Sequence, residues 1–221
     1  MGEGHSWPNF QEICMTSAFS LARALAPLAA VVALAAPVAA SGSAQLSQVE
    51  AHLAATQSMV AAFTQIDGKG RQLSGTLSLK RPGRIRFEYG KGANMLLVGN
   101  GSTLTFIDYD VGQKSAWPVA KSPLSVLLSA NPDLQRIARV VDAGNPNVIV
   151  VRARDARRPE FGTLILAFVK APGAPAGLRL EGWTAIDAQN KKTTVRLANQ
   201  RYNVAVAESA FTFAEPVKKR R

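Results

Sequence analysis

The sequence has few of the residues that build metal sites and disulfides: one cysteine, Cys14, and two histidines, His5 and His52, among 221 residues. One cysteine cannot form an internal disulfide or a thiolate cluster. Two histidines supply few of the ligands that a zinc site needs. We therefore expect no metal and no cofactor. Acidic residues are also scarce, with 15 Asp and Glu against 26 Lys and Arg. The resulting net charge of +11 bears on partners and solubility and leaves the fold open.

Catalytic motifs are missing as well. The chain contains no G-x-S-x-G elbow, no phosphate loop, no H-E-x-x-H and no C-x-x-C. His52 is the one candidate base outside the N-terminal region, and its alanine neighbours on an expected helix favour a solvated surface position. Asp108 and Asp110 stand before Gly112, which indicates turn chemistry rather than a metal site. We predict that the protein is not an enzyme.

The N-terminal region is typical of an export signal. The run 24–36 is apolar but too short and alanine-rich for a stable membrane anchor. Val38-Ala39-Ala40 then matches the small-x-small cleavage pattern. We predict a signal peptide over 15–40, cleaved after about Ala40, with Ala44 as a second choice, and hence a location in the bacterial periplasm.

This cleavage sets the expected domain organisation. Residues 1–14 carry acidic side chains that suit no signal peptide, so we interpret them as an upstream extension before a true start at Met15. One domain is expected over 41–215, followed by a basic tail at 216–221. A run of Pro, Gly and Ala near residue 173 is short enough for a hairpin loop, so no linker divides this domain.

The first part of the domain carries a helical pattern. Apolar residues at helical spacing predict one amphipathic helix over about 45–64. Ser47 and Glu50 form a capping-box pattern at its start. A turn at 67–70 follows.

Beyond this turn, apolar residues recur at every second position, which is typical of antiparallel strands with one buried face. Asn100-Gly101 is a strong hairpin signal, and a last short strand is expected near 211–213. The segment 122–141 interrupts the strands with two short helices. An antiparallel sheet of nine to eleven strands must curl or close into a barrel. We therefore expect a mainly β fold with an α lid: an open, unclosed antiparallel β-barrel, or strongly curved half-barrel sheet, covered by the N-terminal helix and the helical insertion.

Basic residues form one cluster on the expected strands. Arg152, Arg154, Arg157 and Arg158 surround a single loop. They could bind nucleic acid phosphates or anionic lipid head groups. Solvated edge charges that prevent sheet-to-sheet aggregation are the interpretation we favour, and export argues against nucleic acid as a partner.

Several segments, in chain order, resemble the periplasmic outer-membrane lipoprotein carrier family, LolA, over about 45–215. The longest is Gly75 to Tyr89, which is similar to the family's G-x-L…K-R-P-G core. The others are Phe63-Thr64-Gln65, Gly99-Asn100-Gly101, Ser122-Pro123-Leu124, Trp183-x-x-x-Asp187 and Phe211-Thr212-Phe213. Three departures stand out: Asn100 replaces the usual Asp, Thr105 or Phe106 replaces the usual Trp, and the late hairpin lacks its expected glycine.

This resemblance implies a function. Family members hold the acyl chains of triacylated lipoproteins in an apolar cavity under a helical lid. They receive them from an inner-membrane ATP-driven release complex and deliver them to an outer-membrane lipoprotein acceptor. We therefore expect a monomeric carrier with no nucleic-acid partner. An envelope lipid- or lipoprotein-binding sensor or scaffold of the same half-barrel fold is the alternative, since fold does not fix function.

The resemblance also implies site residues. Arg81 matches the arginine of the family's K-R-P motif, which bonds the lid in the closed, empty state; the alternative is an ordinary surface arginine beside a turn. The expected cavity residues are Leu77, Leu79, Phe87, Tyr89, Leu97, Phe106, Trp117 and Trp183. The expected lid residues are Leu124, Leu127, Leu128, Leu134 and Ile137. An error of one residue in strand phase would turn cavity residues to the wrong face.

Overall fold

The computed structural model describes residues 38–217. The predicted upstream extension, the predicted signal peptide before Val38 and the end of the basic tail lie outside the described residues. Within 38–217, no helix combines the length and apolar character needed to cross a membrane.

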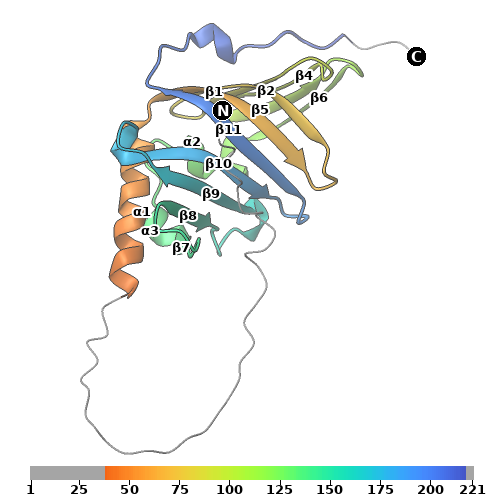
Figure 1. The fold of residues 1–221 in the computed structure, drawn as a ribbon. Coiled ribbons are helices and arrows are strands. Elements are labelled where there is room, and N and C mark those ends of the chain that lie inside the picture. The colour runs from red at the N-terminus through yellow and green to blue at the C-terminus, as the bar shows by residue number, and fades with distance from the viewer. Residues whose placement is uncertain (1–37, 218–221) are drawn as a thin grey trace, which may run out of the picture. The chain divides into compact units, whose positions relative to one another are not determined.

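One antiparallel sheet dominates the described residues (Figure 1). Its eleven strands follow the order β6-β5-β4-β3-β2-β1-β11-β10-β9-β8-β7. Their bounds are β1 Ser58–Asp67, β2 Gln72–Lys80, β3 Arg84–Tyr89, β4 Met95–Asn100, β5 Thr103–Asp108, β6 Gln113–Pro118, β7 Ala138–Val141, β8 Val148–Ala153, β9 Thr163–Lys170, β10 Leu178–Ile186 and β11 Lys192–Tyr202. Strands β6 and β7 are the two edges and do not pair with each other, so the sheet stays open.

The sheet curls strongly, as a ring contact shows. Phe87 on β3 and Trp183 on β10 have ring centroids 6.0 Å apart, although β2, β1 and β11 lie between their strands. In a flat sheet the same strands would be separated by about 19 Å, at about 4.8 Å per strand. Register shifts at Val60/Ala62 and Leu180/Gly182 mark bulges, which increase twist and bend strands. The predicted half-barrel is confirmed.

Short helices accompany the sheet. The α-helices are α1 Val38–Ala55, α2 Ser125–Leu128 and α3 Leu134–Ile137. The 3-10 helices are η2 Val119–Lys121, η3 Pro159–Phe161, η4 Pro175–Gly177 and η5 Glu208–Phe211. Helix α1 lies against η4, α3 and β7 (Figure 1). We call α2, α3 and the residues between them, 125–137, the lid.

The predicted helix over 45–64 is wrong in its second half. The helix ends at Ala55, where Thr56 donates both its N–H and its Oγ1 hydroxyl to the His52 carbonyl. Strand β1 begins three residues later, at Ser58, and pairs with both β2 and β11. Val60 and Phe63 fit a helical period, but the buried Met59, Ala61 and Phe63 follow a strand period, and pairing on both sides fixes the strand.

Two other predicted elements also differ. The helix expected to reach Val141 ends at Ile137 and continues directly as β7. The capping-box residues Ser47 and Glu50 lie inside α1 rather than at its start.

The C-terminal segment 203–215 follows the outer face of the sheet without joining it, and we call it the outer strap. Phe211 packs into a second apolar cluster with Leu96, Val98 and Ile107. Arg86 donates to the carbonyls of residues 210 and 212, at 3.2 and 3.0 Å. The expected strand at 211–213 is therefore wrong, because Phe211 ends the short helix η5 and the segment is held by side chains.

Candidate functional site

The inner face of the curled sheet is apolar from β5 at one side to β8 at the other. One buried cluster joins residues of β1 to β3, β5 and β8 to β11 with residues of α1 and the lid. Leu77, Leu79, Phe87 and Trp183 are buried in this cluster. Partly buried Tyr89, Leu97 and Trp117 pack against it. Phe106 is half-buried and pairs with Leu97, so it lies on the same inner face but outside the packed cluster.

Aromatic rings fill the centre of this face. Phe63 contacts Phe87 and Tyr89 edge to face, at centroid distances of 5.0 and 5.3 Å. The Tyr89 hydroxyl donates to Gln65 Oε1 at 2.9 Å, and burial raises the pKa of Tyr89 to about 12. Phe63 was missing from the expected cavity residues because its segment was assigned to a helix. Its alternation with Met59 and Ala61, both buried, could have placed it on a strand.

The lid presents its leucines to this interior. Leu127, Leu128 and Leu134 are buried in the core cluster, and Leu124 packs against it. Ile137 is half-buried and lines a small hollow of about 60 Å³ between the lid and the loop after β8. All five expected lid residues therefore lie at the lid or directly before it.

A few hydrogen bonds attach the lid to the rest of the domain. The Gly83 N–H, in the turn before β3, donates to the Leu128 carbonyl at 2.9 Å. Glu50 on α1 accepts the Leu134 N–H at 2.7 Å and so caps α3. The Arg154 N–H donates to the Ile137 carbonyl at 2.8 Å. Gln135 adds side-chain hydrogen bonds to Ser43 and Ser47, so α3 of the lid is held to α1 at several points.

Arg81 lies beside this lid attachment but does not bond the lid. Its Nη1 donates to the Leu53 carbonyl near the end of α1. The side chain is 8% exposed, its Nε lacks a hydrogen-bond partner among the described residues, and burial lowers its pKa to about 10. Both expectations for Arg81 are corrected: it is neither a surface arginine nor bonded to α2 or α3. Its guanidinium holds α1, and Gly83, two residues on, holds the lid.

His52 is buried on the face of α1 that packs against the sheet, so the predicted surface position is wrong. It is 1% exposed, its Nδ1 lies 2.9 Å from the Pro175 carbonyl, and its ring meets Phe168 and Tyr202 edge to face. Burial lowers its pKa below the usual value, and the nearby positive charge of Arg81 acts in the same direction. Helix α1 is thus fixed to the sheet by a neutral histidine.

This neutral histidine predicts a pH-dependent stability. Because the unfolded chain binds a proton at His52 that the folded chain resists, the unfolding free energy falls as pH drops from about 6.5 through the lowered folded-state pKa. The slope contributed is at most about 1.4 kcal/mol per pH unit. Urea unfolding of residues 38–221, which contain no other histidine, measures it. The His52→Gln variant should show a shallower pH dependence, and parallel curves would contradict this account.

An open sheet curled around an apolar interior, with short helices over that interior, defines a half-barrel with a lidded hydrophobic interior. The sequence profile of the family described as outer membrane lipoprotein carrier protein LolA matches residues 54–214. The chain therefore belongs to the LolA family.

Individual relatives agree with this membership. An outer-membrane lipoprotein carrier protein of Chromobacterium violaceum is 28% identical over 87% of this chain and 94% of its own length. The protein of the same description from Dechloromonas aromatica is 28% identical over 77% of this chain and 84% of its own.

Solved structures show lower similarity. A LolA superfamily protein from Nitrosomonas europaea has a TM-score of 0.41 at 10% identity and covers 78% of this chain and 97% of its own. MucB has a TM-score of 0.47 at 14% identity over 82% of this chain. This chain spans 66% of MucB, less than two thirds of its length.

Proposed function

We propose that this chain is a periplasmic carrier that holds lipoprotein acyl chains in its apolar interior and shuttles them from the inner membrane to the outer membrane. Its donor would be an inner-membrane ATP-driven release complex, and its acceptor an outer-membrane lipoprotein receptor. The cargo class is triacylated lipoproteins, and no catalytic step is required. The proposal includes export with removal of residues 15–40.

The observation that carries this proposal is the continuous apolar inner face and its cover. The core cluster runs from β2 and β3 across to β8 and β10, and buried lid leucines complete it. The lid itself is two helices of four residues each. An apolar surface of this extent, under a cover of short helices, suits a flexible hydrocarbon ligand better than a polar one.

Energetics explain why such a carrier needs a closing lid. Each buried methylene contributes about 0.8 kcal/mol, so three long acyl chains would exceed the practical limit of about 20 kcal/mol for reversible binding. Acyl chains must displace the packed lid leucines and the Gly83–Leu128 hydrogen bond to enter. Recovery of these contacts on closure offsets the binding energy and allows release.

A release assay tests the proposed function. Inner-membrane vesicles that hold a labelled triacylated lipoprotein are incubated with ATP and residues 38–221, which form one compact unit. We expect the label in the soluble fraction as a one-to-one complex with the protein. Label that stays in the membrane, in the presence of folded protein, would overturn the carrier function.

Arg81→Leu should separate loading from delivery. The substitution removes a buried guanidinium without a carboxylate partner, so stability should stay within about 1 kcal/mol of the wild type or increase. Loading should persist, but transfer to outer-membrane vesicles should slow at least tenfold, because Arg81 no longer holds α1, to which the lid is bonded through Glu50. Arg84→Leu, which removes an outer-face arginine paired with Glu208, is the matched control. Equal transfer rates for the two variants would contradict the role of Arg81.

A further inference from the structure

Three neighbouring connections at one end of the sheet carry a row of cations. Strand order places the β1–β2, β10–β11 and β8–β9 connections side by side at this end, because all six strands are consecutive and antiparallel. We call their exposed cations the basic edge. These are Lys69, Arg71, Arg154, Arg157, Arg158, Lys191 and Lys192.

The opposite end of the same six strands and their neighbours is different. The connections there span 81–83, 101–102, 142–147 and 171–177, and together they contain one cation, Arg81, which is buried. The adjoining strand ends add Lys80 and Arg84, both paired with Glu208, and the exposed Lys170. The positive charge of the connections is therefore concentrated at one end of the half-barrel. A net charge of +11 spread evenly would not produce this difference.

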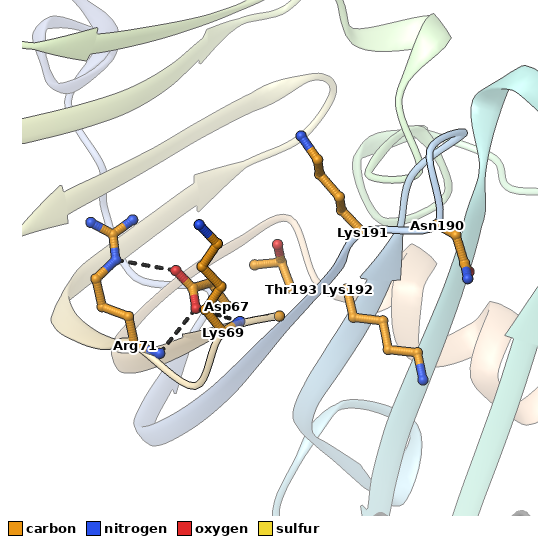
Figure 2. A pocket seen from close by; sticks show the side chains of 8 residues that line it. Asp67, Lys69, Arg71, Asn190, Lys191, Lys192 and Thr193 are labelled. Atoms are coloured by element: carbon orange, nitrogen blue, oxygen red, sulfur yellow. Dashed lines mark hydrogen bonds and ion pairs between the residues drawn. The ribbon is translucent and has the colours of Figure 1, made fainter.

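A hollow of about 830 Å³ lies between the first two connections of the basic edge (Figure 2). Lys69, Arg71, Lys191 and Lys192 line it, together with Asn190 and Thr193. Figure 2 shows the lysine side chains extending away from the two turns. The hollow thus combines four cations with amide and hydroxyl groups that also bind phosphate oxygens.

The acidic residues near the hollow are engaged by their own turns. Asp67 accepts the N–H groups of Lys69 and Arg71, both at 2.9 Å, and the Arg71 guanidinium at 3.1 Å. Asp187 accepts the N–H groups of residues 189 and 191, at 2.9 and 2.8 Å. These bonds fix the turns, and the three lysines of the hollow have no acidic partner among residues 38–217.

The third connection repeats this arrangement. Asp155 accepts the Arg157 N–H at 3.0 Å and pairs with Arg158 at 2.9 Å, so its charge is already neutralised. The side chains of Arg154 and Arg157 show no acidic partner among the described residues. This connection also borders the lid, because residues 154, 155 and 158 share the small hollow with Val126 and Ile137.

We propose that the basic edge docks this end of the half-barrel on an anionic membrane surface, with its lysines and arginines against phospholipid phosphates. The cations lie in a row along three hairpin ends around an open hollow, which suits an extended charged surface. Docking here would bring the part of the lid around Val126 and Ile137, which borders the third connection, to the bilayer. The inference goes beyond the proposed carriage of lipoproteins, and it can be tested without any cargo.

Vesicle binding tests the proposal. Residues 38–221 are mixed with vesicles of phosphatidylcholine containing phosphatidylglycerol, or of phosphatidylcholine alone, and sedimented. The test variant is Lys69→Gln with Lys191→Gln and Lys192→Gln. The control variant, Lys121→Gln with Lys170→Gln and Arg201→Gln, removes the same charge from exposed positions outside the basic edge.

We expect the wild type and control variant to bind the anionic vesicles and to leave them as salt rises. The test variant should bind about 100-fold more weakly, at about fivefold for each cation removed. Equal binding by the test and control variants would overturn the proposal. So would equal binding to both kinds of vesicle, no binding to either, or tighter binding to soluble polyglutamate than to vesicles.

Discussion

Phe87→Ala should lower the free energy of unfolding by about 3–5 kcal/mol, the usual range for a fully buried phenylalanine. Phe87 is among the largest fully buried side chains and contacts the rings of Phe63 and Trp183. Its loss leaves a cavity where the two halves of the sheet meet. For a domain of this size the thermal midpoint should fall by roughly 10 °C. Urea and thermal unfolding of residues 38–221 measure the change.

Phe106→Ala is the matched control, because Phe106 lies on the same inner face but is half-buried and outside the core cluster. It should cost about 1 kcal/mol. A double-mutant cycle of Phe87→Ala with Trp183→Ala adds a direct test of the curl. The rings of Phe87 and Trp183 should couple by about 0.5–1.5 kcal/mol. A coupling near zero, or equal losses for Phe87→Ala and Phe106→Ala, would contradict the curled sheet.

Gly83→Ala is the second large effect. Gly83 has φ +71°, where a side chain costs about 1–2 kcal/mol. A Cβ atom there would also lie 2.2 Å from the Gly101 carbonyl oxygen, which belongs to the backbone and cannot swing aside. The shift needed to relieve this clash would break the Gly83 bond to the lid. We expect a loss of about 3 kcal/mol or more, together with a lid that opens more readily.

The control for Gly83 is Gly92→Ala. Gly92 has φ +93°, but a Cβ atom there meets nothing within 4 Å. This variant should therefore show only the conformational penalty of about 1–2 kcal/mol. Hydrogen exchange at the lid amides, measured on both variants, should accelerate in Gly83→Ala alone. Equal stabilities and equal lid exchange would show that the close approach to Gly101 is unimportant.

Alternation of apolar residues was enough to predict most of the sheet. Asn100-Gly101 lies in the predicted hairpin between β4 and β5. The same alternation assigned Leu77, Phe87 and Trp117 to one face, where the structure places them. Asp108 accepts the N–H of residue 110 and so confirms the predicted turn. These features depend on neighbouring residues, which the sequence displays directly.

Contacts between residues far apart in the chain could not be predicted from the sequence. Nothing near Arg81 indicates that its guanidinium meets the Leu53 carbonyl, 28 residues earlier. The burial of His52 depends on the Pro175 loop, 123 residues later, so its alanine neighbours suggested solvent instead. Glu50 was assigned to its own helix and caps α3, 84 residues away. In each case a partner brought in by the curl of the sheet determines the role of the side chain.

Photo-crosslinking at two adjacent positions of the edge strand β6 tests the central claim most directly. Trp117 packs against the inner core, whereas its neighbour Ala116 is exposed on the outer face. A photoreactive benzoylphenylalanine is placed at one position or the other, and each protein is loaded with labelled lipoprotein and irradiated. We predict crosslinks to the acyl chains from position 117 and none from position 116. Crosslinks from position 116 alone, or from both positions equally, would contradict an acyl-binding interior.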